Sequence, residues 1–150
     1  MRVSIFVAAL AVAVAGHALA DSTQDPTHLY DEVSTQGETM DAFVARISTK
    51  AIEVTEERRV SICGVIGQSG NRFGIRVGTS NTWKKCDIDL ANTVAGFTST
   101  GITFHTTTSD EGSQRGFSAE NFKRPGGYVA FGNVVRYQEG RTKDRIVSSP

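Results

Sequence analysis

Apolar side chains recur at helical spacing between Thr39 and Glu57, and this is the strongest pattern in the chain. Spacings of three and four residues place such side chains on one face of an α-helix. Thr39 can cap the first turn, and Asp41 lies where the helix dipole favours a negative charge. The pattern therefore predicts an amphipathic helix with one face turned to a core. Its apolar positions are Met40, Phe43, Val44, Ile47, Ala51, Ile52 and Val54.

Four later segments have the short, β-branched or alternating pattern that is typical of strands. "RVSICGVIG" (59–67) is mostly apolar, and "RFGIRVG" (72–78) alternates apolar residues with basic residues or glycine. The turn residues between these two segments predict a hairpin. "STGITFHTT" (99–107) predicts a further strand, and "GGYVAFGNVVRYQEG" (126–140) predicts a second hairpin around a Gly-Asn turn.

The remaining segments carry weaker patterns. Residues 21–38 are polar and rich in turn formers, and they predict a flexible N-terminal arm. Residues 141–150 predict a polar C-terminal tail, and "SAENFKR" (118–124) predicts a short helix capped by Ser118. The order of helix, hairpin, strand, loop with short helix and final hairpin predicts an α+β domain over 39–140. We expect one amphipathic helix packed on a mixed, mostly antiparallel sheet.

Residues 1–20 change the expectation about compartment. Arg2, an apolar run from Val3 to Ala15 and the small residues Ala18 and Ala20 form the pattern of a signal peptide with cleavage after Ala20. The run is shorter than the ~20 residues of a membrane-spanning helix, although an uncleaved anchor stays open as an alternative. We therefore expect a secreted or periplasmic protein with no membrane span after signal cleavage.

The chain has two cysteines, Cys63 and Cys86. In an oxidising compartment such a pair favours a disulfide bond, and two buried free thiols are the alternative. In the chain-entropy model, closing a loop of this length stabilises the fold by about 3 kcal/mol. Neither cysteine belongs to a C-x-x-C motif, so the sequence does not support redox catalysis or a zinc ribbon.

The charges are balanced, with 16 basic and 16 acidic side chains. Such a balance gives no electrostatic case for a nucleic-acid partner or an anionic membrane surface. Trp83 with Lys84 and Lys85 could form a contact patch for a protein partner, because exposed aromatic residues often anchor interfaces. The commoner role for such a tryptophan is to cover the edge of a core, and we favour that interpretation.

Three pieces of the sequence together resemble the JAB/MPN (JAMM) metalloprotease family, in particular its secreted bacterial branch. They are the predicted helix followed by "CGVIG", the stretch "GITFHT…FSAEN", and "GYVAFGNVVRY". The second piece is similar to the family's His-x-His at a strand end followed by Ser-x-x-Asp. The resemblance covers residues 39–140. It implies a zinc ion held by two histidines and an aspartate, a glutamate as general base, and a serine that stabilises the oxyanion.

The resemblance is incomplete at the residues that carry the chemistry. His105 matches the first histidine and Ser118 matches the serine. Thr107 stands at the second histidine, Asn121 at the aspartate and Ser61 at the glutamate. The resemblance therefore implies a remnant pocket around His105 and Ser118, in which a single imidazole would hold zinc only weakly.

We interpret the chain as an exported JAB/MPN-like pseudoenzyme that needs no cofactor. It would bind a protein or an extended peptide, as an inhibitor or an immunity-type module. The alternative is an exported metal-dependent peptidase or isopeptidase, in which zinc is held by His105 with Asp110 or Glu120. His105 could also be a plain polar side chain at a strand end. A serine triad lacks a G-x-S-x-G elbow, and Cys63 lies in an apolar strand unsuited to a nucleophile.

Overall fold

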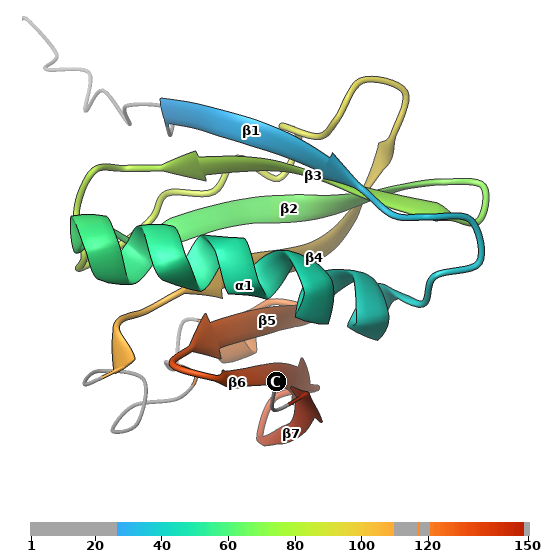
Figure 1. The fold of residues 1–150 in the computed structure, drawn as a ribbon. Coiled ribbons are helices and arrows are strands. Elements are labelled where there is room, and N and C mark those ends of the chain that lie inside the picture. Colours follow the sequence, from blue (N-terminus) through green and yellow to red (C-terminus); the bar gives the residue numbers. More distant parts are fainter. Residues whose placement is uncertain (1–26, 110–116, 118–120, 149–150) are drawn as a thin grey trace, which may run out of the picture.

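The described part of the chain forms one seven-stranded sheet with a long helix across one face (Figure 1). The computed structural model describes residues 27–109, 117 and 121–148. The strand order is β1-β3-β2-β4-β5-β6-β7, and all neighbours are antiparallel except the parallel pair β4 and β5. The expected α+β class, with one helix on a mixed sheet, is confirmed. The elements are β1 (Thr27–Val33), α1 (Met40–Arg58), β2 (Ile62–Ser69), β3 (Arg72–Thr79), β4 (Thr98–Thr106), η1 (Asn121–Lys123), β5 (Gly126–Phe131), β6 (Val134–Glu139) and β7 (Lys143–Ser148).

Helix α1 lies where the apolar periodicity predicts it. The Thr39 side chain accepts a hydrogen bond from the Ala42 amide at 3.2 Å and caps the first turn. Arg59 ends the helix in the left-handed conformation, with φ of 55°, which places the start of β2 later than the apolar pattern predicts. Burying each large side chain of this face stabilises the fold by roughly 1.5–3 kcal/mol. The core joins Phe43, Val44, Ile47, Ala51 and Ile52 of the helix to Ile62, Ile66, Ile75, Val77, Phe104, Tyr128, Ala130 and Val135 of the sheet.

Both ends of the described chain are more ordered than the sequence predicts. Residues 27–33, inside the expected flexible arm, form β1 at one edge of the sheet and pair with β3. Residues 143–148, inside the expected tail, form β7 at the other edge and pair with β6. Both strands are rich in charged and exposed positions and each has a register irregularity. Neither shows the clean alternation that would reveal an edge strand in the sequence.

The first turn of α1 is joined to the far end of the chain by a polar network. The Tyr128 hydroxyl donates to Asp41 Oδ1 at 2.7 Å, and Arg145 Nη2 lies 2.8 Å from Asp41 Oδ2. Arg145 Nε lies 2.8 Å from Glu139 Oε1. Burial, followed by the bond to the Asp41 carboxylate, raises the pKa of Tyr128. This network explains why β7, a strand with little apolar surface, docks beside the helix.

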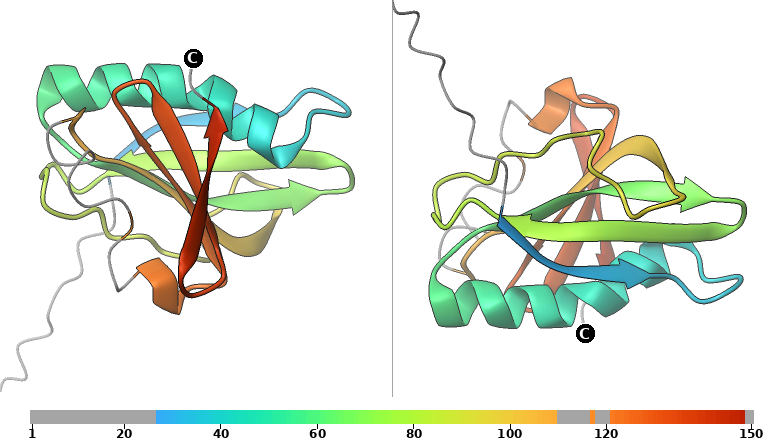
Figure 2. Two further views of the ribbon diagram at one scale, coloured as in Figure 1. Left: turned by 90° about the horizontal axis from the view of Figure 1, so that it is seen from below. Right: turned by 90° about the horizontal axis from the view of Figure 1, so that it is seen from above.

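The face of the sheet opposite α1 is covered by irregular chain. Figure 2 shows α1 on one side of the sheet, and η1 with the loop that joins β3 to β4 on the other. The loop is fastened to β2 by a disulfide between Cys63 and Cys86, with a Cα–Cα distance of 5.9 Å. The predicted disulfide is thereby confirmed. Beside η1 a small apolar cluster comprises Phe117, Val129 and Phe131, with Phe122 and Val134 packed against it. Within the described residues, no helix has the length and apolar character needed to cross a membrane.

Candidate functional site

His105 lies one residue before the carboxyl end of β4, in the middle of the sheet. Its backbone is opposite Cys63 of β2 and Val129 of β5. The neighbouring residue Phe104 is fully buried in the core under α1. Because successive side chains of a strand point to opposite faces, His105 points to the face that carries the disulfide and η1.

The imidazole of His105 lies beside aromatic side chains and within range of a positive charge. The ring of Phe117 meets it edge-on at a centroid distance of 6.4 Å. Phe122 of η1 packs on Phe117 at 5.7 Å. Desolvation, and then the positive charge of Arg124, lower the pKa of His105 to about 4. The imidazole is therefore neutral at neutral pH. A metal cation bound to it would be repelled by the positive charge of Arg124.

Two hydroxyl residues flank His105 at this end of the sheet. Ser61 immediately precedes β2 and Thr107 immediately follows β4. The two strands are antiparallel, and the Ile62 amide donates to Thr106 Oγ1 at 2.9 Å, so that Ser61 and Thr107 lie next to each other. These are the positions at which the family resemblance expects a glutamate and a histidine. The fold thus brings the matched positions together, with hydroxyl groups in place of a base and a ligand.

Glu56 is a carboxylate near this end of the sheet, but its oxygens are engaged. The Ser109 amide donates to Glu56 Oε1 at 2.8 Å, and the Ser109 hydroxyl donates to the same oxygen. Arg59 Nη1 lies 3.5 Å from the other oxygen, Oε2. A general base needs an oxygen within reach of the proton that it removes. Glu56 instead fixes the chain that leaves β4.

The remaining predicted site residues divide between η1 and chain outside the described residues. Asn121 opens η1, and its carbonyl accepts a hydrogen bond from the Arg124 amide at 3.0 Å. Ser118, Asp110 and Glu120 lie outside the described residues, so their predicted roles stay predictions.

The described groups around His105 do not fit a zinc ion. In the part of the chain that the structure describes, no three histidine, cysteine, aspartate or glutamate side chains are grouped closely enough to hold a metal. Beside His105, Ser61 and Thr107 contribute hydroxyls, which are weak zinc ligands compared with imidazole, thiolate and carboxylate. The Arg124 charge opposes a divalent cation at the same place.

An exposed tryptophan lies at the same end of the sheet. Trp83 is 46% exposed, and Lys84 Nζ lies 5.5 Å from the centre of its ring. The Ser61 hydroxyl donates to the Trp83 carbonyl at 2.9 Å, which ties this loop to the start of β2. The favoured interpretation of Trp83 as a cover for the core is wrong, and the contact-patch interpretation fits its exposure. The signal was present in the sequence as a tryptophan followed by two lysines.

Arg124 is the functional candidate that the sequence did not reveal. It stands between η1 and Pro125, in a stretch that reads as an ordinary helix end. Its carbonyl accepts a hydrogen bond from Gln138 Nε2 at 3.1 Å, so β6 fixes its backbone. Its position beside His105 depends on the crossover from β4 to β5, which no local pattern specifies.

Comparison of the chain with protein-family models, with curated proteins and with solved structures found no match. The JAB/MPN resemblance therefore rests on the quoted residues and on their arrangement alone.

Proposed function

We propose that the protein is an exported protein- or peptide-binding module of JAB/MPN-like fold whose metal site is degenerate. The strand order supports the fold assignment, because strands β2 and β4, with the crossover to the parallel strand β5, bring the matched positions Ser61, His105 and Thr107 to one end of the sheet. The signal-like residues 1–20 and the disulfide support export.

The observation that carries the proposal is the chemistry of the His105 end. A hydrolase of this kind needs a metal cation and a carboxylate base beside the substrate. Here Thr107 and Ser61 supply hydroxyls, of which the Ser61 hydroxyl already donates to the Trp83 carbonyl, and the positive charge of Arg124 acts on a neutral imidazole. Such a set of groups is suited to hold a ligand by hydrogen bonds and by charge, and the described residues around His105 include no free carboxylate to activate water.

The partner would dock on Trp83 and reach toward His105. Trp83 offers a large exposed ring at the same end of the sheet, and aromatic residues of this kind carry much of the energy of interfaces. The positive charges of Arg124 and Lys84 favour an acidic side chain in the partner, next to the apolar residue that contacts Trp83. We expect the partner to present an extended segment with an apolar residue and a carboxylate.

Selection of displayed random peptides on the oxidised chain from Asp21 to Pro150 tests this proposal. Affinities of the selected peptides are then measured by calorimetry. Trp83→Ala should weaken binding by about tenfold or more, which is about 1.4 kcal/mol. Leu90→Ala is the matched control, because Leu90 is 40% exposed on the same loop. Peptides whose affinity is indifferent to Trp83→Ala would refute the docking surface.

Elemental analysis of protein purified without chelator separates this proposal from the metallopeptidase. The binding module should contain zinc far below one ion per chain, both in the wild type and in His105→Ala. One zinc per chain that is lost in His105→Ala and kept in His28→Ala would overturn the binding module in favour of the peptidase. His28 is a suitable control because it is exposed on β1 and paired with Asp31 at 2.8 Å.

A further inference from the structure

A hollow lies on the disulfide face of the sheet, between the strands β2 and β3 and the loop that crosses them. Its empty volume is about 280 Å³, part of which is open solvent. Residues 87–89 and Asn92 form the wall on the loop side, and Cys63 and Arg76 line the floor. The hollow is open to solvent and too small to enclose a drug-sized molecule, so it can take one terminal group of a ligand while the rest of the ligand stays outside.

Arg76 is the polar group of the hollow that lacks a partner. It lies on β3 between Ile75 and Val77, which both face the core under α1, so its side chain is on the opposite face. It is half-buried, and it makes no hydrogen bond or ion pair with any residue, as far as the structure describes the chain. Its planar donors match a carboxylate in a bidentate pair.

The two acidic side chains of the hollow, Asp87 and Asp89, differ in whether their charge is paired. Asp87 is paired with Lys85, whose Nζ lies 3.1 Å from Oδ2, so its charge is offset. Asp89 accepts one hydrogen bond, from the Ala91 amide to Oδ1 at 2.8 Å. It forms no ion pair within the described chain and keeps an oxygen that can accept from an N–H group. The hollow therefore presents one unpaired cation and one acceptor that carries a negative charge.

We propose that this hollow binds a ligand that carries a carboxylate and an N–H donor on the adjacent carbon. Arg76 pairs with the carboxylate, and Asp89 accepts a hydrogen bond from the nitrogen. A free α-amino acid and the C-terminal residue of a peptide share this chemistry. The site uses neither Trp83 nor His105, so it does not depend on the proposed peptide-binding function.

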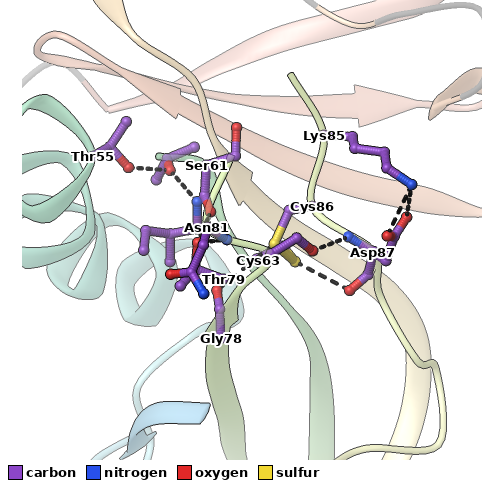
Figure 3. The surroundings of a disulfide bond; sticks show 12 residues. Thr55, Ser61, Cys63, Gly78, Thr79, Asn81, Lys85, Cys86 and Asp87 are labelled. Carbon is purple, nitrogen blue, oxygen red and sulfur yellow. Dashed lines mark hydrogen bonds and ion pairs between the residues drawn. A yellow bond between two sulfur atoms is a disulfide. The ribbon is translucent and has the colours of Figure 1, made fainter. Parts of the chain in front are cut away.

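The shape of the hollow depends on the disulfide. Cys86 joins the start of the loop wall to Cys63 on the floor, as Figure 3 shows. The next residue, Asp87, is held by a hydrogen bond from its amide to Ser80 Oγ at 3.0 Å. Without the covalent bond, the wall would be held above β2 by single hydrogen bonds, this one and those from Ser61 to the carbonyls of Thr82 and Trp83. We therefore expect ligand binding to require the oxidised protein.

Amide chemical shifts of the oxidised chain from Asp21 to Pro150 test the site, with three probes. These are L-alanine, N-acetyl-alanyl-alanine with a free carboxylate, and the same dipeptide amidated at its C-terminus. At least one carboxylate probe should give saturable shifts at Gly78 and Asn92, and the amidated dipeptide should not. Binding of alanine identifies a free amino acid as the ligand class, whereas binding of the acetylated dipeptide alone identifies a peptide terminus. Equal shifts with the amidated probe, or none with any probe, would overturn the proposal.

Variants then test which residues carry the binding. Arg76→Gln should weaken the bound probe by tenfold or more. Arg72→Gln is the matched control, because Arg72 is exposed on the same strand and donates through Nε to the Ser34 carbonyl at 3.2 Å. Cys63→Ser combined with Cys86→Ser should abolish binding while the far-UV circular dichroism persists. An Arg76→Gln variant that binds like the wild type would refute the site.

Discussion

The two faces of the sheet are built on different physical principles. The face under α1 is a continuous apolar core that includes Phe43, Ile66, Phe104 and Tyr128. The other face carries an irregular loop, a disulfide, His105 and a half-buried arginine. Apolar packing is the main stabilisation of the first face, and a polar network at the first turn of α1 adds to it. The second face is held by one covalent bond, several single hydrogen bonds and a small apolar cluster beside η1, and it is the face with chemical groups available to a ligand.

Removing a ring from the core tests the first face and should have the largest effect. Phe43→Ala takes a fully buried ring from the first turn of α1. We expect the free energy of unfolding to fall by about 3–5 kcal/mol, because the rigid sheet cannot close the cavity. Urea unfolding followed by circular dichroism measures the change. Phe122→Ala on the opposite face is the control, since Phe122 is only partly buried, and an equal loss there would show that the two faces are not distinct.

Removing the disulfide tests the second face. Cys63→Ser with Cys86→Ser should lower the free energy of unfolding by about 3 kcal/mol, because the unfolded chain regains the freedom of the closed loop. The helical signal in circular dichroism should persist, since α1 packs on the other side of the sheet. Intact mass before and after alkylation of the unreduced wild type supplies the control, and two alkylated thiols would contradict the bond itself. Loss of the helical signal in the double variant would show that the two faces fold only together.

These two faces also differ in how far the sequence predicts them. The spacing of Phe43, Val44 and Ile47 predicts α1 almost to the residue, and the hairpins follow from their turns, because both signals are local. The sequence does not indicate that Arg76 and Asp89 share a hollow or that Arg124 approaches His105. Those neighbours are set by the loop path and by the parallel crossover between β4 and β5.

The sequence predicts the edge strands less well than it predicts the helix and the hairpins. Residues 27–33 resemble a solvated arm because β1 exposes much of its surface, and its register shifts between His28 and Tyr30. Only the pairing with β3 and the burial of Tyr30 against the core make it a strand. Long-range backbone pairing of this kind leaves little trace in composition or periodicity.

Acid should weaken the second face through His105. The folded pKa is lowered to about 4 from the ordinary 6.5, so the unfolded chain takes up a proton first as the pH falls. The contribution of the neutral His105 to the free energy of unfolding is fully present above pH 6.5 and is lost as the pH falls from there toward 4. It amounts to at most about 3.5 kcal/mol, at 1.4 kcal/mol per pKa unit. Urea midpoints at pH 7 and pH 4.5 should differ less in His105→Gln than in the wild type, and His28→Gln should keep the wild-type difference. An unchanged difference in His105→Gln would contradict the lowered pKa.

The polar contact that joins α1 to the end of the chain should give the smallest effect. Tyr128→Phe removes the hydroxyl that donates to Asp41 at 2.7 Å, while Arg145 continues to pair with the same carboxylate. We expect a loss of about 1 kcal/mol at pH 7.

The raised pKa of Tyr128 adds a dependence on base, because tyrosine in the unfolded chain ionises near 10.0 and the folded residue above it. Its stabilising contribution is full below pH 10 and falls as the pH rises further, so wild type and Tyr128→Phe should converge in urea unfolding at high pH. Tyr137→Phe is the control, because the Tyr137 ring packs on Tyr128 with centroids 4.6 Å apart. This variant leaves the hydrogen bond from Tyr128 to Asp41 in place, so it should keep the wild-type dependence of stability on base. A Tyr128→Phe variant that remains parallel to the wild type at every pH would mean that the hydroxyl is already solvated in the folded chain.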